Sequence, residues 1–173
     1  KIGYTVLENL VKEGYNGVIY PINPTATEIL GMKVYKSISD VPGPIDAACI
    51  TIPAKFVSAA VDECGKKGVK GLIIITSGFS EVGDRALEDE IVAKAHSYNM
   101  RILGPNIVGT LSNSDKLNAS FAPFLPLEGK ASLVTQSGAL LIAIDAASFT
   151  RRVGFDKLVS IGNAADISIS DLV

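Results

Sequence analysis

The chain has 173 residues, of which 47% are hydrophobic and 20% charged, and its formal net charge at pH 7 is −2. This composition is typical of a globular protein, and the sequence has no Lys/Arg-rich run that would favour nucleic acid or an anionic membrane surface. No apolar stretch approaches the roughly 20 residues that a membrane-spanning helix needs. We therefore expect a cytoplasmic protein that binds neither nucleic acid nor membrane.

The first hundred residues alternate between helical patterns and short apolar runs. Continuous apolar runs of strand length occur at "GVIYPI" (17–22), "DAACITI" (46–52), "KGLIIIT" (70–76) and "RILG" (101–104). Helical periods occur at 1–14, 54–68 and 84–100. Strands covered on both faces have this continuous apolar character. The order predicts an α/β fold with a parallel sheet and right-handed crossovers.

A second unit follows a linker. The segment "FAPFLPLEGK" (121–130) concentrates two prolines and a glycine, a pattern typical of linkers. A strand at 131–136, a helix from Ser137 to about Val153 and a strand at 157–163 come after it. We place a domain boundary near Glu128, so that 1–128 form one domain and 129–173 the beginning of another. In a doubly wound sheet the opening helix should follow a central strand, so we expect the first strand to be missing and the second domain to be truncated.

The cysteines and the single histidine offer no metal site. Cys49 falls in a predicted strand and Cys64 in a predicted helix, without metal-ligand spacing, and we expect both to be buried, reduced thiols. His96 lies within an amphipathic helical pattern and is expected at its surface.

Polar and small residues gather at the predicted strand ends, where parallel sheets bind ligands. These segments are "INPTATE" (22–28), "TIPAKF" (51–56), "ITSGFSE" (75–81), "LGPNIVG" (103–109) and "TQSGAL" (135–140). Together they indicate a phosphate-bearing ligand, although helix capping and turns could account for any one of them. A G-x-G-x-x-G fingerprint is absent.

Ser137, between a predicted strand and a predicted helix, has three interpretations: a hydrolase nucleophile, an anion seat or a helix cap. A nucleophile elbow needs glycine two residues before and after the serine, but Thr135 and Ala139 stand there, and no histidine follows. At an N-cap, the N–H groups of Gly138, Ala139 and Leu140 stay free to bind an anion. The anion seat and the plain cap both remain open at this point.

Seven segments together resemble the α subunit, or α-type domain, of the NDP-forming acyl-CoA synthetases. They are "YPINP", "ITIPAKFV", "IIITSGFSEVG", "RILGPNIVG", "KLNASFAP", "LVTQSGAL" and "VSIGNAADI". The resemblance covers nearly the whole chain. The sequence Ile75–Thr76–Ser77, where the succinate enzymes have "ITE", favours the ADP-forming, acetate-activating branch.

This resemblance implies a Rossmann-like CoA-binding domain followed by the start of a flavodoxin-like domain. In the family, acyl phosphate forms from a small carboxylic acid and ATP, the phosphoryl group moves to a histidine, and CoA takes the acyl group. That histidine would lie beyond residue 173, so no catalytic residue is expected here. The resemblance also implies an ATP-grasp β subunit or fused domain, which would bind ATP/ADP and Mg²⁺, within a hetero- or homo-oligomer.

Residue by residue, the resemblance implies two sets of site positions. Those against CoA are Lys1, Ile2, Gly3, Asn23, Pro24, Pro53, Lys55, Thr76, Ser77 and Gly78. Those that seat the phosphohistidine are Ser137, Gly138, Ala139 and Asn163, with Asn106 shaping the cleft. A lysine that some relatives place after the second strand is replaced by Ala26, which leaves the contact to the CoA phosphates open.

Two other functions are distinguishable. A non-catalytic CoA-sensing module, of the kind attached to acetyltransferases, would lack the downstream histidine. An NAD-dependent dehydrogenase needs an acidic residue at the end of the second strand, and Ile22–Asn23–Pro24 stand there instead. The sequence disfavours the dehydrogenase.

Overall fold

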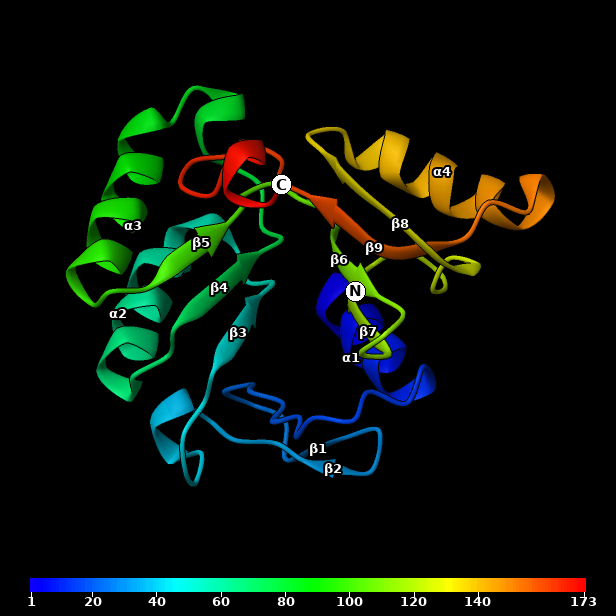
Figure 1. The fold of residues 1–173 in the computed structure, drawn as a ribbon. Helices are drawn as coiled ribbons and strands as arrows, with labels where there is room; N and C mark the ends of the chain where they lie inside the picture. Colours follow the sequence, from blue (N-terminus) through cyan, green and yellow to red (C-terminus); the bar gives the residue numbers. More distant parts are fainter.

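The computed structural model describes residues 1–173 and contains two main sheets (Figure 1). The first is parallel, in the order β3-β4-β5, with β3 at Ala47–Ile50, β4 at Gly71–Ile74 and β5 at Arg101–Leu103. The crossover helices α2 (Val57–Lys67) and α3 (Arg85–Ser97) lie side by side against it. This is the β-α-β order that the continuous apolar runs predicted.

The second sheet is mixed, in the order β7-β6-β9-β8. Strands β6 (Gly109–Ser112) and β7 (Leu117–Ser120) form an antiparallel hairpin. Strands β8 (Glu128–Thr135) and β9 (Phe155–Ser160) are parallel and joined by helix α4 (Gly138–Arg151). Because β6 pairs with β9, the second sheet includes residues that precede Glu128. The boundary near Glu128 therefore separates segments of sequence rather than the two sheets, and it stays a prediction.

Helix α1 (Ile2–Lys12) lies against β7 of the second sheet (Figure 1). A short hairpin of β1 (Glu28–Ile29) and β2 (Met32–Lys33) follows it. Four 3₁₀ turns complete the elements: η1 at Ile38–Asp40, η2 at Ala54–Phe56, η3 at Ser80–Val82 and η4 at Ile169–Asp171. No helix is both long and apolar enough to cross a membrane.

The strand predicted at 17–22 does not form. Its one pairing is an isolated bridge between Ile22 and Tyr35, and Val18 is 76% exposed. An extended segment becomes a strand only when a neighbour takes up its backbone hydrogen bonds. No strand lies beside 17–22, and Val18 and Ile22 stay exposed while Ile19 and Tyr20 are half-buried.

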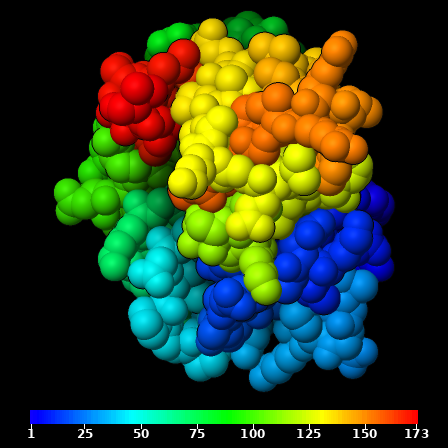
Figure 2. Space-filling model, turned by 45° about the vertical axis from the view of Figure 1, so that its right-hand side comes forward, coloured from blue at the N-terminus to red at the C-terminus, as the bar shows by residue number.

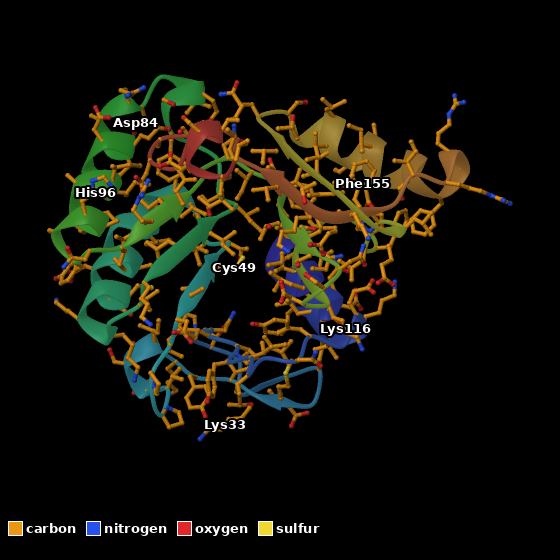
Figure 3. All side chains as sticks on the ribbon, in the orientation of Figure 1. Lys33, Cys49, Asp84, His96, Lys116 and Phe155 are labelled. Atoms are coloured by element: carbon orange, nitrogen blue, oxygen red, sulfur yellow. The ribbon has the colours of Figure 1, made fainter.

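The expectation for the two cysteines is half wrong. Cys64 is buried in α2, and burial raises the pKa of its thiol to about 11. Cys49 is exposed on β3 (Figure 3), where the exposed Ala47 and Cys49 alternate with the half-buried Ala48 and the buried Ile50. The continuous apolar run could not reveal that only one face of this strand would be buried.

The chain after β9 returns to the first sheet and lies along β5. Backbone N–H groups of Asn163, Ala165 and Ile167 donate to the carbonyls of Pro105, Gly104 and Ile102, at 3.0, 3.1 and 3.1 Å. Figure 2 shows the C-terminal residues packed against the α3–β5 region. We call residues 161–167 the return segment. It connects the second sheet directly to the edge of the first.

Candidate functional site

A cleft of about 740 Å³ lies at the carboxyl ends of the first-sheet strands, facing the start of α4. Its lining comes from segments 51–53, 75–77, 106–108 and 162–163, together with Ile2, Phe121, Gln136, Gly138, Ala139 and Ile142. Carboxyl ends of parallel strands are the usual ligand edge of such sheets. The sequence therefore brings segments more than 100 residues apart to one site.

The wall of the cleft on the first-sheet side is held by short polar contacts. The Thr76 hydroxyl donates to the Ile52 carbonyl at 2.7 Å, which ties the end of β4 to the end of β3. Gly78 has a φ of +109°, a conformation that side-chain-bearing residues rarely adopt. A Cβ at Gly3 would come within 2.6 Å of the Thr51 hydroxyl, so α1 approaches this wall closely because residue 3 is glycine.

The opposite wall is the N-terminus of α4. The Ser137 hydroxyl accepts a hydrogen bond from Leu140 N at 3.2 Å, so Ser137 is the N-cap of the helix. A Cβ at Gly138 would lie 2.4 Å from a methyl carbon of Val108, so the start of the helix fits here only with glycine. The first-turn N–H groups have no acceptor within the helix, and the helix dipole adds partial positive charge. The N-terminus of α4 can therefore bind an anion while Ser137 caps the helix.

Two asparagines join the walls. Asn106 adopts the left-handed conformation, and its Nδ2 donates to Asn163 Oδ1 at 3.2 Å. Asn163 Nδ2 lies 2.7 Å from Glu81 Oε2, 2.7 Å from Glu88 Oε2 and 3.1 Å from Ser80 Oγ. The side chain of Asn163 is thus engaged at both ends within the chain.

Neither Glu81 nor Glu88 appeared among the predicted site residues. Burial would raise the pKa of Glu81, but hydrogen bonds from Gly78 N and Asn163 outweigh it and hold the pKa below its usual value. Glu88 follows the buried face of α3, in phase with Ile91 and Ala95. A carboxyl group on an otherwise apolar helix face is the signal of a buried, hydrogen-bonded group, although it does not show which site the group belongs to.

The predicted site residues fall into three groups. The cleft is lined by Ile2, Pro53, Thr76, Ser77, Asn106, Gly138, Ala139 and Asn163. Lys1, Gly3, Gly78 and Ser137 do not line it but are next in sequence to residues that do, and Lys55 is two residues from the lining residue Pro53. Asn23 and Pro24 are not brought to it: Asn23 Oδ1 instead accepts from Thr25 and Ala26 in a local turn.

The lining contains no ionisable side chain. Hydroxyls, amides, backbone groups and apolar side chains make up its surface. Such a cleft can bind and orient a ligand, but it supplies no general acid, general base or activated nucleophile of its own. The residues also include no group of three His, Cys, Asp or Glu side chains placed to hold a metal ion.

Two family models match the chain. Residues 1–112 match the model described as a CoA binding domain, and residues 128–173 match the succinyl-CoA ligase like flavodoxin domain. The matches confirm the fold class inferred from the sequence: a Rossmann-like CoA-binding unit followed by the start of a flavodoxin-like unit.

Individual proteins give the same result. The chain is 50% identical to acetate–CoA ligase [ADP-forming] of Methanocaldococcus jannaschii, over all of this chain and 24% of that protein. It is 46% identical to the acetate–CoA ligase [ADP-forming] I subunit alpha of Pyrococcus furiosus, over all of this chain and 39% of that subunit. The chain therefore spans between a quarter and two-fifths of these relatives.

The fold also matches a solved structure. This is the dinucleotide-forming acetyl-coenzyme A synthetase 1 of Ca. Korarchaeum cryptofilum in complex with phosphate and ADP. The TM-score is 0.95 at 48% identity, over 97% of this chain and 36% of that one. The chain accordingly belongs to the CoA-binding domain family, in the form found in NDP-forming acyl-CoA synthetases.

Proposed function

We propose that this chain is the CoA-binding part of an ADP-forming acyl-CoA synthetase, as an α subunit or an α-type domain. The protein would interconvert acid, ATP and CoA with acyl-CoA, ADP and phosphate, with acetate as the acid. The observation that supports this most directly is the cleft, where strand ends of the first sheet face the N-terminus of α4. The first-sheet wall suits a thiol-bearing ligand, and the wall formed by the start of α4 suits an anion.

The lining fits the uncharged arm of CoA. Ile2, Ile52 and Phe121 offer apolar surface, while Thr76 and Ser77 offer hydroxyl groups. Lys1, next to the lining residue Ile2, and Lys55, two residues after the lining residue Pro53, are exposed, and we assign them to the CoA phosphates. Asn23 and Pro24 stand apart from the cleft, so we give them at most a contact with the far end of the ligand.

The start of α4 fits a phosphoryl group. Backbone N–H groups at Gly138 and Ala139, with the helix dipole, favour a dianion without any side-chain cation. In the proposed reaction this is the seat of a phosphohistidine supplied from outside the chain. An ATP-grasp subunit or fused domain would bind ATP/ADP and Mg²⁺, since the cleft has neither a carboxylate nor a lysine to do so.

The experiment is to assay the intact protein for acetyl-CoA formation from acetate, ATP and CoA, and to measure CoA binding by calorimetry with NAD as the control. Binding of CoA but not NAD, together with acetyl-CoA formation, supports the proposal. Binding of CoA without turnover would favour the CoA-sensing module, which the ligase names of the relatives do not favour. A folded protein that fails to bind CoA would overturn both functions.

A further inference from the structure

A buried carboxylate stands next to the cleft without a part in the proposed function. The side chain of Glu88 is 2% exposed. Its Oε2 accepts from Ser80 Oγ and from Asn163 Nδ2, both at 2.7 Å, while the guanidinium of Arg85 is 3.8 Å from Oε1. A buried carboxyl group needs hydrogen-bond partners in place of water, and the partners of Glu88 show which segments it holds together.

The group of greatest consequence is Asn163, which belongs to the return segment. Its Nδ2 is also 2.7 Å from Glu81 Oε2, and its Oδ1 accepts from Asn106 Nδ2. We call Ser80, Glu81, Glu88, Asn106 and Asn163 the Asn163 bracket. These contacts cross 57 to 83 residues of sequence.

The bracket touches both walls of the cleft. On the first-sheet side, Glu81 Oε1 accepts from the backbone N–H groups of Gly78 and Phe79, directly after the lining residue Ser77. On the other side, Asn163 follows β9, which pairs along its length with β8, the strand that leads into α4. A Cβ at Gly162 would lie 2.3 Å from the Asn106 carbonyl, so the backbone between the walls has little room to shift.

We propose that Glu88 is a positioning residue: through Asn163 it fixes the separation between the Thr76–Phe79 loop and the N-terminus of α4. This inference rests on the proposed function, because that separation matters where CoA on one wall meets an acyl or phosphoryl group on the other. Glu88 does not line the cleft and takes no part in bond making. Misplacement of reacting groups by about 1 Å lowers rates by up to about a hundredfold.

A purely structural role for Glu88 makes a different prediction. If Glu88 only ordered the Ser80–Val82 turn in front of α3, its loss would lower stability or disturb CoA binding. A positioning role instead leaves each wall able to bind its own ligand. Only the transfer step, in which CoA on one wall meets the acyl or phosphoryl group on the other, becomes slower.

The test uses the intact protein and three variants at position 88 and its partner. Glu88→Leu roughly keeps the side-chain volume but removes the acceptor, and Glu88→Gln keeps an acceptor oxygen. Asn163→Ala removes the same contact from the other side. Asp89→Asn, an exposed carboxylate one residue away on α3, is the matched control. For each we measure kcat and KM in acyl-CoA formation, and the Kd of CoA by calorimetry.

We expect Glu88→Leu to lower kcat about tenfold or more while the Kd of CoA changes by less than about twofold. Glu88→Gln should recover most of the lost kcat, and Asp89→Asn should match the unmodified protein. Because both residues act through one contact, Glu88→Leu combined with Asn163→Ala should be no slower than the more damaging single variant. If Glu88→Leu fails to fold, Ser80→Ala takes its place, because Ser80 Oγ donates to Glu88 Oε2 and Ser80 does not line the cleft; a lower kcat with an unchanged Kd of CoA is again expected.

Three results would overturn the inference: an unchanged kcat in both single variants, equal losses in kcat and CoA affinity, or strictly additive effects in the double variant. An unmodified protein that makes no acyl-CoA would instead remove the proposed function, and this inference with it. The unmodified protein and the variants therefore separate the two failures.

Discussion

The two sheets are stabilised in different ways. The first has a cluster of 13 buried apolar residues between the strands and helices α2 and α3. The second has a cluster of five, and the polar residues buried around it include Ser112, Asn118, Ser120 and Asp145. Asn9 of α1 adds to these by donating to the carbonyls of Ser120 and Ala122 at 2.9 and 2.7 Å.

This difference in packing shows where a change of pH should alter the stability of the protein. The free energy of an apolar cluster is nearly independent of pH, whereas buried polar groups must be hydrogen-bonded or neutral. The second sheet holds Asp145, a buried carboxyl group without a hydrogen-bond partner, and it is therefore where we expect the largest response to protonation. The cleft lies where the two kinds of packing meet.

The largest expected effect concerns Asp145 of α4. It is fully buried, neither of its carboxylate oxygens has a hydrogen-bond partner, and burial, aided by the charge of Glu13, raises its pKa to about 7. In the unfolded chain the pKa is near 3.9, so between about pH 4 and pH 7 the unfolded chain ionises while the folded one stays protonated. The folded state thus loses stability as pH rises through this window, by roughly 4 kcal/mol at most.

Asp145→Asn should remove this dependence. The difference between the unfolding free energies of the two proteins cancels the contributions of the other titrating groups. We expect the stability of the variant to rise relative to that of the unmodified protein from pH 4 to pH 8. Asp46→Asn, at an exposed position, is the control and should show no such gain. A difference that stays constant across pH 4–8 would contradict the raised pKa.

The next effect tests the apolar cluster of the first sheet. Ile91 of α3 is fully buried in it, and Ile91→Ala should lower the free energy of unfolding by about 2–5 kcal/mol. This loss should be nearly the same at pH 5 and pH 8, in contrast to the effect at Asp145. Denaturant titrations at both pH values measure it. A pH-dependent loss would mean that the two regions are not as different as their packing indicates.

The third effect concerns the contact between the regions. The Asp166 side chain of the return segment accepts from Arg101 Nε at 3.0 Å and from Ile102 N at 2.6 Å, and it contacts His96 Nε2 at 3.0 Å. Burial would raise the pKa of Asp166, but these hydrogen bonds, that of Arg101 foremost, hold it below its usual value. Hydrogen bonds to charged groups contribute about 1.5–3 kcal/mol, so we expect Asp166→Ala to destabilise the protein by about 2 kcal/mol at pH 7.

The sign of the pH effect at Asp166 is opposite to that at Asp145. A lowered pKa stabilises the folded state above the unfolded value of about 3.9, and this is lost as pH falls through the folded pKa. The cost of Asp166→Ala should therefore shrink in acid. Asp171→Ala removes a more distant partner of Arg101, 3.5 Å away, and should have a smaller effect at every pH. Equal losses of unfolding free energy in Asp166→Ala and Asp171→Ala would contradict the prediction that Asp166 is the more important partner of Arg101.

The sequence predicted the first sheet better than the second for a physical reason. Runs such as "KGLIIIT" are apolar throughout because the strands are covered on both sides, and this feature is local. Strands β6 and β7 were not predicted, because "GTLS" and "LNAS" mix apolar and polar residues whose burial depends on Asn9 and on β9. Residues 17–22 show the converse, since their apolar pattern needs a neighbouring strand that the pattern itself does not specify.

The candidate site likewise has a part that the sequence could predict and a part that it could not. Loops at strand ends could be located from their Gly, Ser, Thr and Asn residues, and most of those predicted line or adjoin the cleft. Glu88 could not be assigned to the site, because its contact with Asn163 spans 75 residues and depends on the path of the return segment. The resemblance places Asn23 near CoA, which stays a prediction; the structure shows that its side chain accepts hydrogen bonds within its own turn.

The smallest expected effect separates the two roles of the α4 N-terminus. Ser137 caps the helix through Leu140 N, so Ser137→Ala should lower the free energy of unfolding by about 1 kcal/mol. The proposed anion contacts use backbone N–H groups, which this substitution leaves in place, and acyl-CoA formation should fall by no more than about threefold. Gly138→Val is the contrasting variant, because its Cβ would lie 2.4 Å from the Val108 side chain and displace the helix start. Gly138→Val should abolish acyl-CoA formation. If Ser137→Ala loses as much activity as Gly138→Val, the serine hydroxyl itself holds the anion and the helix N-terminus does not.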